Sequence, residues 1–376
     1  MAIDTHDCKE IIKLAGGAYQ NNREVRVNDA LVELDPTSDM RWDQYVADHP
    51  EGTIYHHSAW MQILTKTYGY PPCCIGLVSS EGNRLTGILP LMAVKSYLTG
   101  TRLVSLPFTT YCTPLMPESR LEEAMRLAMK RFPGTRHVEL KFLKTENGSE
   151  ESGPRSVKTP FVNQILSLKG DLNLLFKRLH RSCIRQHVQR AEREGLFFQT
   201  EGNESDLRRF YELMSEVRIR SGLPPAPFNF FLNMLRILGG KGLCDLVVVK
   251  FEGQVIAAGL LLKDKRNWHL EYAASDSNFL KLGPNQYLIW ECIKGAKEQG
   301  AEFFDFGRTA VWQESLLEFK DRWQADRHII LHRYYPEKSV DPHWSDPSQS
   351  LLARVNKKLP PLLVEWEGRL LYRHRG

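Results

Sequence analysis

A histidine and a carboxylate stand two residues apart in the strand-like stretch from Trp268 to Ala273. Alternate side chains of a strand point to the same face, so His269 and Glu271 share one face. A histidine beside a carboxylate can take up a proton as a general base. A hydrogen-bonded structural histidine has the same sequence pattern, and both interpretations remain open.

A second carboxylate, Asp305, lies within the aromatic run Phe303–Phe306, which is predicted to be a strand. In that position Asp305 could accept a proton from a substrate amine or orient the neighbouring Arg308. A paired structural aspartate fits the pattern equally well.

The tetrapeptide Leu282-Gly283-Pro284-Asn285 follows a predicted strand directly and opens a helix that should run to about Gln299. Glycine lets another group approach the backbone closely, and the free N–H groups of a first helical turn attract phosphate. Proline is tolerated at the first helical position because its missing N–H has no helical partner there. The segment is therefore a candidate phosphate site or, alternatively, an ordinary turn between a strand and a helix.

Apolar periodicity predicts an alternation of helices and strands in both halves of the chain. In the first half the expected helices cover 39–49, a segment that opens at Ser58, and 121–131, and the expected strands cover 74–78, 85–90, 103–106 and 138–142. In the second half the expected helices cover 171–194, 204–220 and 284–299, and the expected strands cover 243–251, 254–263, 267–274 and 303–306.

Both halves contain a strand, a Glu-Gly turn and a second strand that carries a glycine. Because this arrangement recurs in equivalent order, at Glu81-Gly82 and at Glu252-Gly253, it indicates a duplicated α+β unit. The polar segment Thr145–Lys158 is the predicted linker. The expected organisation is a loose leader (1–30), two domains (31–150 and 151–335) and a basic amphipathic tail (336–376).

The net charge of +5 is concentrated in two segments. Lys177–Gly195 has six lysine or arginine residues against two glutamates, and Leu351–Gly376 has the same numbers, which leaves the remainder slightly acidic. A slightly acidic chain does not suit extensive binding to a phosphate backbone, so any contact with a polyanion should be confined to the two basic segments. In the first segment Arg178, Arg181 and Arg185 would lie on one face of a helix, where they could meet phosphates of tRNA or lipid.

The second basic segment mixes its charges with leucine, tryptophan and tyrosine, as helices that lie in a membrane interface do. Pro360-Pro361 divides this tail into two short helices at most. We expect the tail either to dock on an anionic membrane, through residues 351–376, or to pack on the body with a solvated basic face.

Composition excludes several classes of protein. Hydrophobic residues make up 42% of the 376 residues and charged residues 25%, as in ordinary globular chains. No apolar run is long enough to span a membrane, and the acidic residues near the N-terminus do not fit a signal peptide, so a cytoplasmic location is expected. Seven scattered cysteines without ligand spacing suggest neither a disulfide framework nor a zinc site, and no metal is expected.

A series of motifs between about Trp42 and Tyr335 occurs in the order found in one known family. The motifs are Tyr55-His56-His57-Ser58-Ala59-Trp60, Gly87-Ile88-Leu89-Pro90-Leu91, 103–108 and Tyr111 in the first half, and Ile184-Arg185, 190–195, 218–224, Gly283-Pro284-Asn285, Asp305-Phe306-Gly307-Arg308 and 318–323 in the second. With these motifs the sequence resembles the FemAB-like proteins of the GNAT acyltransferase superfamily, especially the branch found beside exopolysaccharide and exosortase (PEP-CTERM) genes.

The resemblance implies an α+β fold of tandem GNAT-like domains, with mixed sheets flanked by helices. It implies transfer of an acyl or aminoacyl group from acyl-CoA or aminoacyl-tRNA to an amine of a cell-envelope or polysaccharide precursor, with no metal. The protein would then work at the inner membrane face. Where this branch has two glycines after its tyrosine, the present chain has Cys112-Thr113, a departure that concerns the shape of the acceptor pocket.

The resemblance also implies roles for single residues. Lys320 follows Phe319 where Fem ligases have a Phe-Lys pair near the transferred carbonyl, so its ammonium would stabilise the oxyanion. A solvated helical face is the alternative for this charged stretch. Gly283 and its neighbours would hold the pyrophosphate of the donor.

Further residues would contact the substrate. Arg218 and Arg220 stand where the family has an arginine that contacts phosphate or sugar, although two bases at the end of a helix are also favourable for the helix itself. Tyr111, Phe319 and Arg308 are assigned to substrate binding.

Two other functions fit the same sequence. One is a catalytically silent accessory protein that binds a polysaccharide or lipid-linked precursor through the same cleft. The other is a tRNA-dependent ligase of the peptidoglycan bridge.

Overall fold

The computed structural model describes residues 29–97, 100–145, 156–337, 340 and 344–374, and its elements form two compact units. Among the described residues, the first unit is built from those up to Val162 and those from Arg327 to residue 340, and the second from Asn163–Asp326 and those from Trp344 onward. Residues 1–28 of the expected leader (1–30) and most of the expected linker lie outside the described residues, as does Cys8. Among the described helices, none is long and apolar enough to cross a bilayer.

The two units do not coincide with the expected ranges 31–150 and 151–335. The boundary lies inside strand β7 (Ser156–Ser167), and strand β13 (Asp326–Tyr335) returns to the first unit. The reason is a long antiparallel ladder in which β13 pairs with β6 (Thr135–Thr145), from His328 opposite Thr145 to Tyr335 opposite Val138. Pairing between strands so far apart in sequence has no local signal.

The first unit contains two sheets. A three-stranded antiparallel sheet has the order β1-β2-β3, and in the other sheet β4, β5, β6 and β13 are followed by the first half of β7. Its further elements are β1 (Ala30–Leu34), β2 (Cys74–Val78), β3 (Leu85–Leu89), β4 (Met92–Ser96), β5 (Gly100–Val104), α2 (Met40–Asp48), α3 (Ser58–Tyr68) and α4 (Glu118–Arg131). The apolar face of α4, with Leu121 and Met125, packs against Ile75 and Leu103 to form one core.

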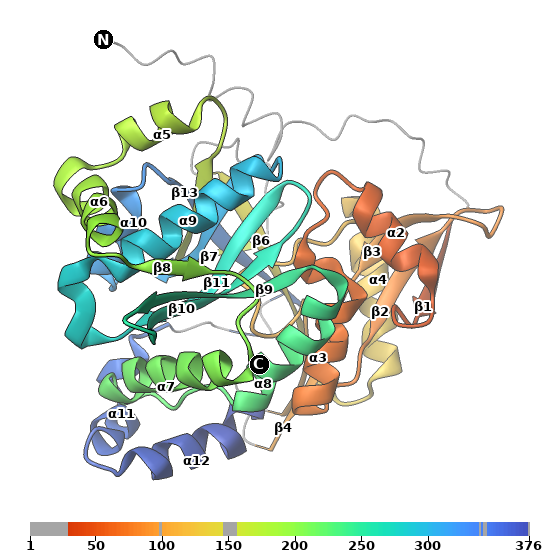
Figure 1. The fold of residues 1–376 in the computed structure, drawn as a ribbon. Coiled ribbons are helices and arrows are strands. Elements are labelled where there is room, and N and C mark those ends of the chain that lie inside the picture. The colour runs from red at the N-terminus through yellow and green to blue at the C-terminus, as the bar shows by residue number, and fades with distance from the viewer. Residues whose placement is uncertain (1–28, 98–99, 146–155, 338–339, 341–343, 375–376) are drawn as a thin grey trace. The chain divides into compact units, whose positions relative to one another are not determined.

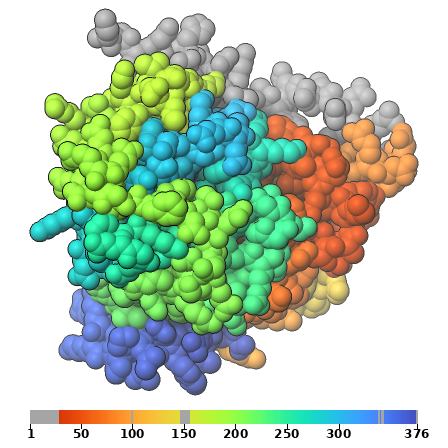
Figure 2. Space-filling view, in the orientation of Figure 1, coloured from red at the N-terminus to blue at the C-terminus, as the bar shows by residue number. Residues whose placement is uncertain are grey.

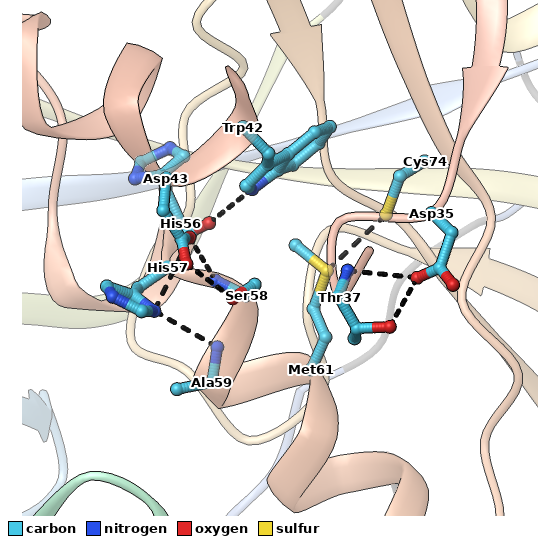
Figure 3. Close-up of polar contacts among 10 residues, drawn as sticks. All are labelled: Asp35, Thr37, Trp42, Asp43, His56, His57, Ser58, Ala59, Met61 and Cys74. Atoms are coloured by element: carbon cyan, nitrogen blue, oxygen red, sulfur yellow. Dashed lines mark hydrogen bonds and ion pairs between the residues drawn. The ribbon is translucent and has the colours of Figure 1, made fainter. Parts of the chain in front are cut away.

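The start of α3 is held by side chains of the preceding segments (Figure 3). Asp43 on α2 accepts hydrogen bonds from the backbone N–H of Ser58 at 2.8 Å and from its hydroxyl at 2.6 Å. Trp42 donates its indole N–H to the carbonyl of His56 at 2.8 Å. These hydrogen bonds thus tie the start of α3 to α2.

Replacement of Asp43 by alanine removes the acceptors of both Ser58 hydrogen bonds. The effect should resemble the loss of an N-cap from a helix. We expect the free energy of unfolding to fall by about 1 to 2 kcal/mol. Chemical denaturation of Asp43→Ala checks this, with the exposed Asp48→Ala as the matched control. A loss below about 0.3 kcal/mol would show that Asp43 does not hold the start of α3.

The second unit is a mixed sheet covered on both faces by helices (Figure 1). The second half of β7 is followed in the sheet by β12, β11, β10, β9 and β8. Its further elements are β8 (Phe197–Gln199), β9 (Cys244–Phe251), β10 (Gln254–Lys263), β11 (Asn267–Ser275), β12 (Phe303–Ala310), α5 (Leu172–Arg178), α6 (Gln186–Arg193), α7 (Glu204–Arg220), α8 (Phe228–Ile237), α9 (Pro284–Glu298) and α10 (Glu314–Asp321). Helices α6 and α9 pack together, α9 contacts β9 to β11, and α7 contacts the same strands.

The two Glu-Gly turns expected from the duplication join equivalent hairpins, β2 with β3 and β9 with β10. Gln254 pairs with Phe251, so Glu252 and Gly253 form a two-residue turn. Both turn residues have positive φ, at 49° and 80°, as the tightest hairpin turns require. Both hairpins also contain a register shift, at Leu77/Val78 and at 255–257.

The single helix predicted over 171–194 is wrong. Helix α5 ends at Arg178, a π-helical turn η2 covers Arg181–Arg185, and α6 follows it. The break lies at His180, whose backbone N–H donates to the carbonyl of Arg322 and whose side chain caps the N–H of Cys183. Tertiary contact therefore interrupts the periodicity, and the three arginines do not share one continuous helical face.

The tail forms two short helices, α11 (Leu351–Asn356) and α12 (Pro361–Leu371), as the two prolines predicted. Helix α12 packs on α7, so the tail belongs to the second unit. All described cysteines are free, and most of them are buried.

Candidate active site

Strands β11 and β12 pair in parallel over three positions only, and the last pair is His269 opposite Asp305. On its other side β11 has a bulge: Leu270 and Tyr272 face consecutive residues of β10, and Glu271 is the extra residue between them. A bulge bends a strand and redirects its side chains. His269 and Glu271 therefore lie where β11 stops pairing with β12.

His269 is held between two carboxylates. Its Nε2 lies 2.9 Å from Oε2 of Glu271, and its Nδ1 lies 3.5 Å from Oδ2 of Asp305. Burial by itself lowers the pKa of His269, but the charges of Asp305 and Glu271 outweigh burial, so the pKa is raised above its ordinary value. The surroundings thus favour the imidazolium form, in which both ring nitrogens donate.

Asp305 is fully buried and joins several groups of the site. Its Oδ1 accepts the backbone N–H of Gly307 at 2.7 Å, and its Oδ2 accepts the amide N–H of Asn163 at 2.9 Å. A buried carboxylate without such donors would be costly, so these bonds stabilise Asp305 in the interior beside His269.

Lys320, on α10, is only 7% exposed, which excludes the solvated helical face as its setting. Its ammonium donates to the carbonyl of Gly307 at 2.8 Å. Burial lowers the pKa of Lys320 to about 8, although the charges of Asp305 and Glu271 oppose this change. At neutral pH Lys320 thus remains an ammonium in a buried setting, where its charge acts more strongly than it would in water.

Gly307 connects these groups, because its N–H binds Asp305 and its carbonyl binds Lys320. Its φ is +71°, and a Cβ there would lie 3.3 Å from Nε2 of His269. Both the backbone conformation and the space beside His269 thus require glycine.

Sequence reasoning did not identify the contribution of β7 to the site. Gln164 donates its amide to Oδ1 of Asp321 at 2.9 Å and to the carbonyl of Leu317, so it holds α10 against the sheet. Its neighbour Asn163 binds Asp305, and both residues are fully buried. The signal in the sequence was this amide pair inside the apolar run 161–166.

The candidate phosphate loop lies at the N-terminus of α9. Gly283 has a φ of +77°, and a Cβ there would come within 2.7 Å of the carbonyl oxygen of His187. The loop is fixed by Gln286, which donates to the carbonyl of Cys183, and by Arg190, which donates to that of Lys281.

The two elements that contact this loop, η2 and α6, both carry arginines. Among the described residues, Nε of the half-buried Arg185 has no hydrogen-bond partner. The loop does not follow β11 directly as predicted, because a 3-10 turn, η4 (Ser277–Leu282), lies between them. Leu282 ends that turn, and Pro284 and Asn285 are the first helical residues.

Two of the predicted substrate-binding arginines lie near the bulge. Tyr272 lies at the bulge, and burial and the charge of Glu271 raise its pKa. Arg308 and Arg218 are near enough for their charges to lower the same pKa. Arg308 is exposed on β12, and Arg218 donates to the carbonyl of Pro224. Arg220 is exposed at the end of α7.

The two aromatic residues of the predicted site have other neighbours. Phe319 packs against the core of the second unit, with its ring centroid 6.3 Å from that of Trp323. Tyr111 belongs to the first unit, where its ring meets Tyr55 edge to face. The adjacent Cys112 is fully buried, and burial raises the pKa of its thiol. Substrate contact by Phe319 and Tyr111 stays a prediction.

Comparisons with known proteins agree with this architecture. Residues 178–321 match the family model described as "Acetyltransferase (GNAT) domain". The structure titled "Crystal structure of FemX" is 15% identical with a TM-score of 0.62, and the match covers 80% of this chain and 96% of that one. A "Tandem GNAT protein from the clavulanic acid biosynthesis pathway (without AcCoA)" is 11% identical with a TM-score of 0.51, over 84% of this chain and all of that one. No curated protein matches the sequence. The chain is thus a mixed α/β protein of the tandem GNAT fold, with a GNAT acetyltransferase domain that contains His269, Glu271, Asp305 and Lys320.

Proposed function

We propose that the chain is an N-acyltransferase of the FemAB-like GNAT type, which transfers an acyl or aminoacyl group to an amine. The observation that carries the proposal is the buried cluster of His269, Glu271, Asp305 and Lys320, inside the matched domain and at the point where β11 and β12 separate. Concentrated buried charge with altered pKa values is typical of catalytic sites.

In the proposed reaction Glu271 is the proton acceptor. A histidine with a raised pKa is a poor base at neutral pH, so the geometry favours Glu271 over His269, which was the candidate from sequence. His269 then positions Glu271 through the 2.9 Å contact, and Asp305 holds the other side of the imidazole ring. These two are positioning residues, and Glu271 contacts the amine.

The carbonyl carbon of the donor forms a bond to the amine nitrogen as the proton passes to Glu271. The carbonyl oxygen gains negative charge, which the ammonium of Lys320 stabilises. When the carbonyl forms again, the C–S or C–O bond to the carrier breaks. CoA then leaves as a thiolate, and tRNA leaves as a hydroxyl group that takes back the proton held by Glu271. The loop at the N-terminus of α9, with Leu282, Gly283, Pro284 and Asn285, binds the phosphates of the carrier.

The acceptor is proposed to be an amine of a cell-envelope or polysaccharide precursor. This part of the proposal rests on the motifs that resemble the exopolysaccharide-associated branch, with Arg218, Arg220 and Arg308 as the residues that would contact phosphate or sugar oxygens.

Donor binding tests the proposal. Thermal shift and titration at fixed salt should show saturable stabilisation by acetyl-CoA, a longer acyl-CoA or an aminoacyl-tRNA, about 2.7 kcal/mol at a hundred times Kd. Gly283→Ala should weaken binding about tenfold or more, because the new methyl group collides with His187 and φ is positive.

The matched control is Gly240→Ala, where an added Cβ meets open space. Stabilisation by aminoacyl-tRNA alone would assign the tRNA-dependent reaction. Binding that is unchanged in Gly283→Ala would remove α9 as the phosphate site. If none of the three donors stabilises the protein, the proposed transferase activity would be contradicted, and an accessory protein that binds the precursor would be favoured.

A further inference from the structure

The two tail helices are attached to the second unit through their small and polar residues. A Cβ on Gly368 would collide with the carbonyl of Pro225, so α12 lies directly on that backbone. Asn356 donates to the carbonyl of Gly222 at 3.3 Å and to Glu367 at 2.6 Å. Val364, a residue of α12, is fully buried. These contacts fix which side of α11 and α12 faces outward.

The outward side is apolar. Among the described residues, nine of the eighteen large apolar side chains that are exposed lie between Leu351 and Leu371. On α12 Leu362 is 76% exposed, Trp366 61% and Leu370 51%, and these residues recur every four positions on one face. A helix that packs on a core normally buries its leucines, so α12 has the reverse arrangement. In the space-filling view the two helices form a border of the second unit beside α7 (Figure 2).

Basic side chains surround this apolar face. Arg354, Lys357, Lys358, Arg369 and Arg373 are all exposed, and the two acids of the stretch, Glu365 and Glu367, are half-buried. One of these acids binds Asn356 in the attachment described above. The outer surface therefore has an excess of positive charge around leucine and tryptophan.

We propose that α11 and α12 form a docking surface for an anionic lipid bilayer. Leucine and tryptophan would enter the interface between headgroups and acyl chains, while the lysines and arginines contact lipid phosphates. Helix α12 has 11 residues, too few to cross the hydrocarbon core, so the helices lie in the membrane surface. A second copy of the chain fits less well, because two such faces would bring like charges together.

This proposal does not depend on the proposed transferase activity, and vesicle binding tests it without any donor. The protein is sedimented with phosphatidylcholine vesicles and with vesicles that contain about one quarter phosphatidylglycerol, at low and at high salt. We expect affinity for the anionic vesicles to be at least about tenfold higher, and to fall as salt rises.

Two variants separate the apolar contribution from the charged one. Trp366→Ser and Lys357→Glu/Lys358→Glu should each reduce binding about tenfold or more. Their controls are Phe197→Ser, at a residue of equal 61% exposure, and Arg236→Glu/Lys241→Glu, exposed bases elsewhere on the same unit. The controls should bind as the wild type does, and circular dichroism should show the same fold for all variants.

Three results would overturn the proposal. The first is no binding of the wild type to anionic vesicles at low salt, and the second is equal loss in the variants and their controls. The third is concentration-dependent dimerisation that Trp366→Ser abolishes, which would make a second copy the occupant of this face.

Discussion

Replacement of Lys320 by methionine is expected to reduce kcat/KM about 100- to 1000-fold while the fold is kept. Methionine has a similar length and fills the same buried space, but it supplies no charge to the carbonyl oxygen of the donor. The proposed activity of the wild-type protein should also fall as the pH rises above about 8, because the Lys320 ammonium then loses its proton.

The same substitution changes how stability depends on pH. The pKa of Lys320 is about 8 in the folded chain and 10.5 ordinarily, so between these values the unfolded chain binds more protons than the folded chain. The free energy of unfolding of the wild type should therefore rise between pH 8 and 10.5, by at most about 3 kcal/mol. Lys320→Met should lack this rise.

Urea denaturation across this pH range, together with steady-state kinetics, measures both effects. The exposed Lys241→Met is the matched control and should resemble the wild type in both. Full activity of Lys320→Met would show that another group stabilises the oxyanion. A rise in stability that persists in the variant would show that a different residue titrates.

The second large effect is expected for Asp305→Asn, which should reduce kcat/KM about 100-fold or more. Asparagine keeps the shape and still accepts the N–H of Gly307, but it removes the charge beside Nδ1 of His269. The pKa of His269 should then fall, because only the charge of Glu271 still opposes the lowering of this pKa by burial. With a less cationic His269, Glu271 loses its positioning partner.

The fold should tolerate this change. The amide oxygen of Asn163 has no hydrogen-bond partner among the described residues, so rotation of that amide can accept the new N–H of residue 305. A histidine titration by NMR separates the electrostatic effect from a structural one, and Asp245→Asn, in an ion pair with Lys263, is the control. An unchanged pKa of His269 in Asp305→Asn would contradict the proposed coupling.

Local periodicity predicted many elements of the second half closely. Helix 204–220 and strand 254–263 have the predicted bounds, because each combines a regular apolar pattern with a clear end signal such as the N-cap Asn203 or the turn at Glu252-Gly253. The helix predicted over 171–194 was wrong, since the bond from His180 to the carbonyl of Arg322 depends on a partner more than a hundred residues away.

The candidate site, too, was predicted only in part from the sequence. Residue types and spacing selected His269 and Asp305 as candidates, and the resemblance to Fem ligases selected Lys320. The GNAT fold expected from the resemblance is confirmed. Sequence could not show that Lys320 is buried rather than solvated, or that His269 is held between two carboxylates.

The sequence by itself determined the alternation of elements, the duplicated hairpins and the residue types of the candidate site. Only the tertiary structure decided which of those residues meet, that β13 pairs with β6, and that the leucines of α12 face outward. The physical reason is that spacing along the chain fixes which side chains share a face. Burial and the charges of distant segments then fix protonation, and neither is encoded locally.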